Sequence, residues 1–429
     1  MSDEHNQDIF HWPIVTDEDE QAVLAVLRAG TMSGTDITKQ FEREFADYVG
    51  TRYALGTCNG TAALQETFWA CGVGIGDEVI CPSMTYWASC TSALALGASL
   101  NFADIDPETL CIDPDDIEHR ICDRTKAIVV VHYAGYPADM DRIMAIAHRH
   151  SVKVIEDVSH AQGSLYKGKM CGSLGDIAGT SMMAGKSLVV GEGGMVTTNN
   201  RELLERCIAF GHYERTAKSN YAVPSEQIKS ENLNLYTGVP LGGVKHRMNQ
   251  VCSAMGRVQL KHYPRRIAEI QKAMNYFWDR LEGVPGIRAH RVKPDTDSTM
   301  GGWYNAHGLY RAEELNGLSC EKFCERVTAA GVPIQCGANF PLHLHPVFHN
   351  FDFLHTGKPA MTAFSARDVR QGKGSLSVTE RMHDLTFSIP WFKHFIPTII
   401  DQYVEVFKRV INNHNDCCNR TQNKKEMLP

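Results

Sequence analysis

The residues best suited to chemistry lie between positions 154 and 194. Lys186 stands between small residues in TSMMAGKSLVVGEGG (180–194), and an apolar run follows it. Such surroundings desolvate an amine and lower its pKa toward the nucleophilic range, although a lysine in a loop is more often a solvated surface charge. Asp157 ends an apolar run in VIEDVSHAQG (154–163), where a carboxylate serves equally well as a helix cap or turn residue.

Lys186 and Asp157 together supply the two groups that one cofactor requires. Pyridoxal phosphate needs a lysine to form a Schiff base with its aldehyde. It also needs an acid that keeps its pyridine nitrogen protonated, so that the ring can accept electrons from the substrate Cα. The two residues therefore predict a site for this cofactor.

Two further segments offer contacts for such a cofactor. In CNGTAAL (58–64), Gly60 and Thr61 open a predicted helix, whose first N–H groups and positive dipole end can receive a phosphate. An ordinary turn with an N-cap fits the same residues. Ser181 is a candidate for another phosphate hydroxyl. In PSMTYWAS (82–89), Tyr86 or Trp87 can lie flat on a cofactor ring, or belong to the core.

The elements that position these residues follow an alternating pattern from residue 51 to about 200. Short apolar runs predict buried strands, and helical patterns lie between them at 61–71, 86–96 and 139–150. The strands are expected at 78–81, 99–103, 127–132, 152–156 and 195–198. This alternation indicates an α/β fold with a mostly parallel sheet and helices on both faces. Ligands bind such sheets beyond the carboxyl ends of the strands, where Asp157 and Tyr86 are expected.

The second half of the chain is organised differently. Residues 249–281 read as one long helix, or as two with a break at Pro264, and 282–412 mix strands, turns and helices. A polar stretch at 214–231 is typical of a surface loop or a dimer arm. We expect a large cofactor-binding domain at 1–270, a smaller α+β domain at 271–412 and a flexible polar tail at 413–429.

Composition excludes several classes of protein. The 429 residues are 43% hydrophobic and carry a net charge of −7, which excludes a disordered chain and gives no sign of a basic nucleic-acid surface. No apolar stretch approaches the ~20 residues of a membrane helix. The acidic start lacks the pattern of a secretory signal, so a cytoplasmic protein is expected. Fourteen cysteines without a CxxC pair read as reduced thiols, and no metal site is expected.

Five segments together resemble a known family. They are CNGTAAL, GDEVICPSMTYWAS, VIEDVSHAQG, GDIAGTSMMAGKSLVVGEGG and GVKHRM. Their order and spacing are similar to those of the DegT/DnrJ/EryC1/StrS sugar aminotransferases, from about Gly34 to Asn412. The resemblance implies fold type I of the pyridoxal phosphate enzymes, with a three-layer large domain. It also implies a homodimer with active sites at the subunit interface, and amino transfer to a keto-sugar or cyclitol.

The resemblance also implies roles for single residues. Lys186 matches the lysine that forms the Schiff base and moves the proton between Cα and the cofactor. Asp157 matches the partner of the pyridine nitrogen, and Tyr86 matches the ring-stacking aromatic. The phosphate contacts match Gly60, Thr61 and Ser181. Because Lys186 is retained, the related sugar dehydratases, which carry histidine there, are excluded.

Three positions depart from the family pattern. His160 stands where a glutamine near the cofactor's phenolic oxygen is usual, and Asn59 replaces a common serine. Lys245, in GVKHRM, occupies the place of an asparagine that many members extend from the partner subunit to the phosphate. A lysine can make the same contact with more charge.

The acceptor is expected to contact FPLHLHPVF (340–348), which resembles the family's substrate loop, through His343 or His345. The segments MMAGKS, GVKHRM and MGGWYNAHG are closest to a branch with octulosonate (Kdo-type) aminotransferases of lipopolysaccharide biosynthesis. Inosose and nucleotide-linked keto-sugar aminotransferases are the alternatives. Glutamate is the expected amino donor, with glutamine as the alternative. A regulator that keeps this fold without catalysis is the competing interpretation.

Overall fold

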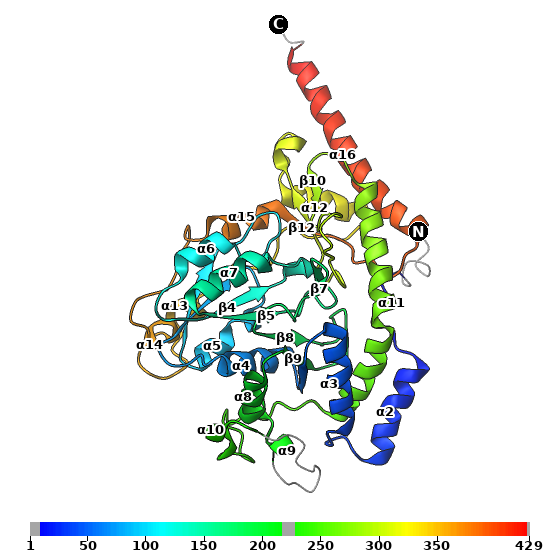
Figure 1. The fold of residues 1–429 in the computed structure, drawn as a ribbon. Helices are drawn as coiled ribbons and strands as arrows, with labels where there is room; N and C mark the ends of the chain where they lie inside the picture. Colours follow the sequence, from blue (N-terminus) through cyan, green and yellow to red (C-terminus); the bar gives the residue numbers. More distant parts are fainter. Residues whose placement is uncertain (1–8, 217–227, 427–429) are drawn as a thin grey trace.

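The computed structural model describes residues 9–216 and 228–426, and a seven-stranded sheet forms its centre (Figure 1). The strand order is β1-β9-β8-β5-β4-β2-β3. β9 runs antiparallel to both of its neighbours, and the other neighbouring pairs are parallel. The strands are β1 (Tyr53–Thr57), β2 (Glu78–Pro82), β3 (Ser99–Ala103), β4 (Thr125–Val131), β5 (Lys153–Asp157), β8 (Ile177–Ser181) and β9 (Gly194–Thr198). The mostly parallel sheet is thus confirmed.

The five strands predicted from apolar runs occur within two residues of their expected bounds. Their residues are almost entirely buried because helices cover both faces of the sheet, which is why they read as continuous apolar runs. The other two strands, β1 and β8, were not predicted from the sequence. Apart from Ile177, the residues of β8, IAGTS, are small or polar and give no periodic hydrophobic signal.

Helices on the two faces make the expected three layers. Figure 1 shows α6 (Pro114–Arg120) and α7 (Met140–His150) on one face, and α4 (Gly60–Ala70), α5 (Thr91–Ala95) and α8 (Arg201–Gly211) on the other. The helix expected at 86–96 is divided into a 3-10 turn, Trp87–Ser89, and α5, because Cys90 takes a non-helical conformation between them. Two N-terminal helices, α2 (Asp17–Ala29) and α3 (Asp36–Val49), pack against α11.

The long helix α11 (Gln250–Arg280) continues through Pro264, which settles the choice between one helix and two. Its first half packs on α2 and α3, and its second half enters the core of the smaller domain through Phe277 and Trp278. The predicted domain boundary at residue 270 therefore falls within a single helix that both domains share.

The smaller domain is built on a three-stranded antiparallel sheet. Its strands, in the order β10-β11-β12, are Ile287–Ala289, His307–Tyr310 and Thr386–Ser388. The helices α12 (Cys320–Ala329), α15 (Ser377–Leu385) and α16 (Pro397–Glu426) pack around it. α16 runs on through most of the segment expected to be a frayed tail, since the sequence has neither Gly nor Pro between 398 and 426 to stop it.

Short elements complete the chain. The hairpin β6–β7 (Leu165–Tyr166, Lys169–Met170) follows β5, and α13 (Val347–Asn350) and α14 (Ala360–Ala363) lie in the loop before α15. The expected arm at 214–231 begins in α9 (Tyr213–Thr216) and ends in α10 (Glu231–Asn234), but 217–227 lie outside the described residues.

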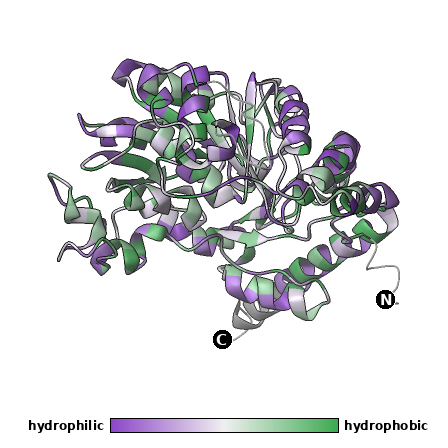
Figure 2. Ribbon diagram, turned by 90° about the horizontal axis from the view of Figure 1, so that it is seen from below, coloured by the Kyte–Doolittle hydropathy of each residue, from purple (hydrophilic) through white to green (hydrophobic). Residues whose placement is uncertain are grey.

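Hydropathy follows this layering. Hydrophilic and hydrophobic residues alternate along the outer helices in Figure 2, as expected for helices with one face on a core. Across the described ranges, 9–216 and 228–426, no helix is both long and apolar enough to cross a bilayer.

Candidate active site at the carboxyl end of the sheet

A cavity of about 580 Å³ opens where β5 and β8 end. It gathers seven residues that the sequence predicts as cofactor contacts, namely Gly60, Thr61, Tyr86, Asp157, His160, Ser181 and Lys186. These residues come from four segments of the chain, namely the start of α4 and the ends of β2, β5 and β8 with the loops that follow them, and the sheet brings these segments together. The cavity is therefore the candidate active site.

Lys186 lies in the loop between β8 and β9, with only 8% of the residue exposed. Burial lowers the pKa of its amine to about 8, although the nearby Asp157 carboxylate acts in the opposite direction. Its Nζ atom lies 3.9 Å from the centroid of the Tyr304 ring. The backbone carbonyl oxygen of Lys186 accepts a 2.9 Å hydrogen bond from Trp12 Nε1 of the N-terminal segment. The predicted desolvated amine is thus present, with its side chain against Tyr304 and its backbone bonded to Trp12.

Asp157 is the last residue of β5, and two donors orient its carboxylate. Oδ2 accepts from Ser89 Oγ at 2.7 Å, and Oδ1 accepts from the Ser159 backbone N–H at 3.0 Å. Because the Ser89 hydroxyl gives its proton to Asp157, it accepts from Thr85 Oγ1, which lies 2.8 Å away. The loop after β2 therefore fixes the acid that the sequence assigns to the pyridine nitrogen.

The N-terminus of α4 approaches the end of β8 very closely. A Cβ atom on Gly60 would lie 2.5 Å from the Cβ of Ser181, so only glycine fits there. The Asn59 side chain caps the helix by accepting from the Ala62 N–H at 2.8 Å. The first N–H groups of a helix have no acceptor within it, and Gly60 and Thr61, the first residues of α4, line the cavity together with Ser181. This arrangement fits a phosphate.

His160 is buried in the same cavity. Its Nδ1 accepts a 3.4 Å hydrogen bond from the Ala134 N–H. Burial, together with the charge on Lys186, holds the pKa of this imidazole well below its usual value, so the ring is neutral. The single ring proton is then on Nε2, which leaves one N–H donor for a ligand.

Two predicted cofactor contacts lie toward the outside. Tyr86 lines the cavity but is 52% exposed, with its ring centroid 4.9 Å from that of Trp87. Lys245 does not line the cavity of its own chain. Its Nζ atom lies 5.6 Å from the ring centroid of Tyr213.

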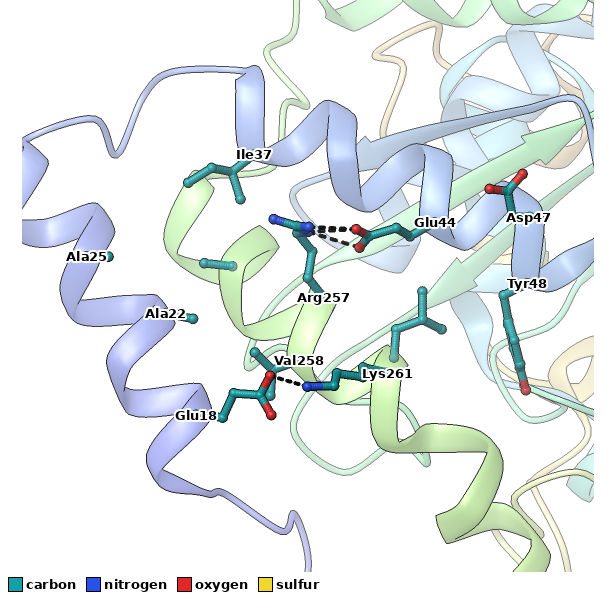
Figure 3. A pocket seen from close by; sticks show the side chains of 12 residues that line it. Glu18, Ala22, Ala25, Ile37, Glu44, Asp47, Tyr48, Arg257, Val258 and Lys261 are labelled. Carbon is teal, nitrogen blue, oxygen red and sulfur yellow. Dashed lines mark hydrogen bonds and ion pairs between the residues drawn. The ribbon is translucent and has the colours of Figure 1, made fainter.

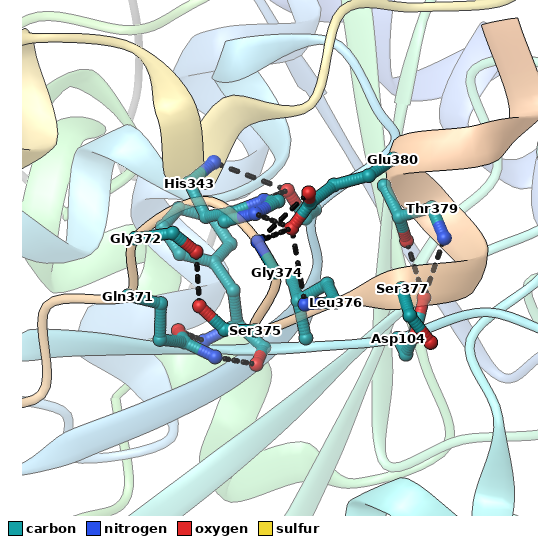
Figure 4. A network of polar contacts seen from close by, with 12 residues as sticks. Asp104, His343, Gln371, Gly372, Gly374, Ser375, Leu376, Ser377, Thr379 and Glu380 are labelled. Carbon is teal, nitrogen blue, oxygen red and sulfur yellow. Dashed lines mark hydrogen bonds and ion pairs between the residues drawn. The ribbon is translucent and has the colours of Figure 1, made fainter.

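The structure does not bring the predicted substrate histidines into the site. His343 is 1% exposed and joins two other elements, with Nδ1 2.7 Å from Ser83 Oγ and Nε2 3.1 Å from Glu380 Oε1 (Figure 4). His345 caps its own turn by accepting from the Val347 N–H at 3.2 Å. Neither side chain lines the cavity, because both fasten the loop that precedes α15.

The smaller domain adds three cavity residues that were not predicted as site residues from the sequence. Tyr304 and Asn305 come from the turn before β11, and Asn339 comes from the loop after α12. Trp303 and Asn305 both have positive φ, 54° and 56°, so the turn is strained around Tyr304. Asn339 is held by Tyr133, whose hydroxyl donates to its Oδ1 at 2.7 Å. The only sequence signal was the unusual run GGWYN at 301–305.

A second cavity, of about 730 Å³, lies between α2, α3 and α11 (Figure 3). Its charged side chains form ion pairs, Arg257 with Glu44 at 2.7 Å and Lys261 with Glu18 at 2.6 Å. No predicted site residue lines this groove. The chemistry therefore belongs to the Lys186 cavity.

Taken together, the donor set of the Lys186 cavity fits pyridoxal phosphate. A helix N-terminus with two hydroxyls suits the phosphate, a desolvated amine suits the aldehyde, and an oriented carboxylate suits the pyridine nitrogen. The phosphate and carboxylate groups lie at the start of α4 and at the ends of β5 and β8, and Lys186 lies in the loop that follows β8.

Comparison with known proteins agrees with this geometry. The model of the DegT/DnrJ/EryC1/StrS aminotransferase family matches residues 13–405. The spore coat polysaccharide biosynthesis protein SpsC of Bacillus subtilis is 34% identical, over 78% of this chain and 84% of its own. An L-glutamine:2-deoxy-scyllo-inosose aminotransferase of Streptomyces kanamyceticus is 33% identical, over 79% of this chain and 78% of its own.

Solved structures agree as well. An aminotransferase from Psychrobacter cryohalolentis superposes with a TM-score of 0.80 at 30% identity, covering 94% of this chain and 99% of its own. The family model spans nearly the whole sequence, and one cavity holds a lysine, a carboxylate and a phosphate cradle. The chain therefore belongs to the DegT/DnrJ/EryC1/StrS family and is a pyridoxal-phosphate-dependent aminotransferase.

Proposed function

We propose that this enzyme moves an amino group from glutamate to a keto-sugar, for the synthesis of an amino sugar of a polysaccharide such as lipopolysaccharide. The buried amine of Lys186, with its pKa near 8, is the observation that carries the proposal. An amine of this pKa can both give and take a proton near neutral pH. Relatives named as SpsC, GDP-perosamine synthase and inosose aminotransferase support a sugar or cyclitol acceptor.

Different residues of the chain would hold the cofactor and transfer protons. Pyridoxal phosphate, when bound, supplies a protonated ring that accepts electrons from the substrate Cα. Lys186 Nζ would anchor the cofactor aldehyde, and its free amine would take up the Cα proton of the amino donor. The Asp157 carboxylate would keep the proton on the pyridine nitrogen. Tyr86 would cover the ring.

The other contacts orient the cofactor. Gly60 and Thr61 at the start of α4, with Ser181, hold the phosphate, and the partner subunit's Lys245 adds a positive charge. His160 donates from Nε2 to the phenolic oxygen, as the neutral tautomer allows. The enzyme is thus proposed to act as a homodimer with shared active sites.

The choice of acceptor depends on charge in the cavity. Among the described lining residues, the carboxyl groups are those of Asp157 and Glu192 and the amine is that of Lys186, and the smaller domain contributes Tyr304, Asn305 and Asn339. Amides and a phenol suit a polyhydroxylated ketone, and Glu192 disfavours a carboxylate close to it. An inosose or nucleotide-linked keto-sugar is therefore a strong second candidate beside 8-oxo-3-deoxy-octulosonate. The latter requires cations from the partner.

One experiment tests the function and the acceptor together. The pyridoxamine form of the enzyme is mixed with nucleotide-linked keto-sugars, inososes and 8-oxo-3-deoxy-octulosonate, and visible absorbance is followed. The true acceptor restores the absorbance and yields an amino sugar by mass spectrometry. The first half-reaction is measured with glutamate and with glutamine.

Lys186→Ala is the control for this screen. It should abolish the visible absorbance of the lysine-linked cofactor and amine transfer, while the melting temperature stays close to that of the wild type. Full transfer in this variant would refute the catalytic role of Lys186. A wild-type protein that never binds the cofactor would refute the proposal in favour of a regulator.

A further inference from the structure

Inside the large domain, a buried carboxylate joins two histidines that are far apart in the sequence. Glu66, in the middle of α4, is 0% exposed. Its Oε1 is 2.8 Å from His212 Nε2 and 3.1 Å from His246 Nδ1. Both histidines are buried, and His246 follows Lys245 directly. The cluster therefore connects α4, whose first turn forms the phosphate cradle, with the segment that carries Lys245.

The cluster is charged at neutral pH. Burial opposes the imidazolium form of His212, but the carboxylates of Glu66 and Glu214 raise the pKa of His212 to about 9. Burial likewise opposes ionisation of Glu66, and the two histidines nevertheless lower its pKa. A buried, hydrogen-bonded ion pair tolerates little displacement of its partners, because a buried charge without its partner is costly.

Backbone hydrogen bonds run along the segment that carries Lys245. The Gly242 N–H donates to Phe210 O at 2.9 Å, and the His246 N–H donates to Gly211 O at 3.1 Å. On the opposite side, the Cys58 N–H donates to His246 O. The segment is thus held between the end of α8 and the end of β1, one residue before the Asn59 cap of α4.

The side chains in this region alternate between inside and outside. His212 and His246 point inward to Glu66, and their neighbours Tyr213 and Lys245 meet on the outside, at 5.6 Å between ring centroid and Nζ. In extended chain, adjacent side chains point to opposite faces. Holding His246 against Glu66 therefore sets the direction in which Lys245 leaves the surface.

We propose that Glu66 is a positioning residue for the cofactor phosphate: through His246 it fixes the Lys245 side chain in the orientation that reaches the phosphate in the partner subunit. The inference rests on the proposed role of Lys245. Glu66 would then contribute to cofactor affinity although it touches neither cofactor nor substrate.

The test compares pyridoxal phosphate with pyridoxal, which has the same aldehyde and ring but no phosphate. Dissociation constants of both are measured on the full-length apoenzyme by visible absorbance. Glu66→Gln keeps the shape of the side chain and removes its charge. We expect its affinity for pyridoxal phosphate to fall about tenfold, the size of one lost charge-assisted hydrogen bond, and its affinity for pyridoxal to stay within about twofold.

A double-mutant cycle then asks whether Glu66 acts through Lys245. Lys245→Ala should itself lose about tenfold in pyridoxal phosphate affinity, and adding Glu66→Gln should lose little more. Asp19→Asn is the matched control, since Asp19 is a buried carboxylate in α2 that accepts from Gln259 Nε2 at 2.7 Å, away from this segment. Its effect should add to that of Lys245→Ala.

Each result of these measurements supports or overturns the inference. Equal losses for pyridoxal phosphate and pyridoxal in Glu66→Gln, or losses that add to those of Lys245→Ala, would overturn the inference and leave Glu66 a structural residue. Unchanged affinity in Lys245→Ala would instead refute the proposed role of Lys245. If Glu66→Gln does not fold, His246→Phe is held to the same criteria.

Discussion

The two ends of the Lys186 cavity are built in different ways. The end for the phosphate and ring is formed by the ends of strands and the first turn of α4, with Gly60 against Ser181 and Asp157 held by two donors. The opposite end is formed by loops of the smaller domain, which supply Tyr304, Asn305 and Asn339. The difference suggests that the cofactor end is rigid and specific, whereas the acceptor end is where members of one fold can diverge.

The largest effect is expected at the cofactor end, from Asp157→Asn. A neutral amide cannot keep the pyridine nitrogen protonated, so kcat should fall about 10²-fold to 10³-fold. Ser89→Ala should lower kcat only about fivefold, because the Ser159 N–H still holds the carboxylate. Steady-state kinetics with the identified acceptor measures both. Equal losses would show that the orientation of Asp157, rather than its charge, matters most.

Gly60→Ala is expected to have the next largest effect, because it disturbs the phosphate site at the start of α4. The added methyl overlaps Ser181, and relief of an overlap of this kind costs about 1–3 kcal/mol, which corresponds to about 5-fold to 150-fold weaker binding of pyridoxal phosphate. Gly74→Ala is the control, since a Cβ atom there meets nothing within 4 Å. Absorbance titration of the apoenzymes gives the affinities. If both variants bind the cofactor like the wild type, the close approach of α4 to β8 is not needed.

A smaller effect is expected in the pH dependence of the reaction between the Lys186 amine and an aldehyde. Only the neutral amine attacks an aldehyde, so the rate at which the apoenzyme reacts with pyridoxal should rise with pH and level off above a midpoint of about 8. Stopped-flow absorbance between pH 6 and pH 10 would show it. A midpoint near the usual lysine value of 10.5 would mean that the amine is exposed to water.

Tyr304→Ala tests the other end of the cavity. Loss of the ring lets water reach Lys186, so the pKa of the amine should rise, even though the lost cation–π contact, worth about 1 kcal/mol, acts the opposite way. Affinity for pyridoxal phosphate should stay within about threefold of the wild type, while KM for the acceptor rises. A tenfold loss of pyridoxal phosphate affinity would show that Tyr304 also serves the cofactor, and the cofactor end and the acceptor end would then not be separate in function.

Much of the cofactor end could be predicted from the sequence, because it depends on local patterns. Apolar runs located the strands, and the polar residues that follow them, Asp157 and Tyr86, fell at the carboxyl edge of the sheet as expected. Strand β8 was missed because IAGTS has no apolar period, although Ser181 at its end was still recognised from its distance to Lys186.

The acceptor end could not be predicted in the same way. Tyr304 and Asn305 reach the cavity through a turn with positive φ, and such turns leave no periodic signal. His343 looked suitable because FPLHLHPVF resembles the family's substrate loop, yet Ser83 and Glu380 hold it inside the protein. Glu66 drew no attention, since one acid in an apolar helix reads as an exposed position until its partners, 146 and 180 residues away, are known.

The hydrogen bond from Trp12 to the carbonyl of Lys186 also matters for handling the protein. Any change to the N-terminal segment around Trp12, such as a truncation or a tag, would disturb a side chain that is bonded to the backbone of the reactive lysine. The C-terminal end of α16 projects away from the body of the molecule in Figure 1. Spectroscopic and kinetic work on the lysine is therefore best done with material tagged at the C-terminus.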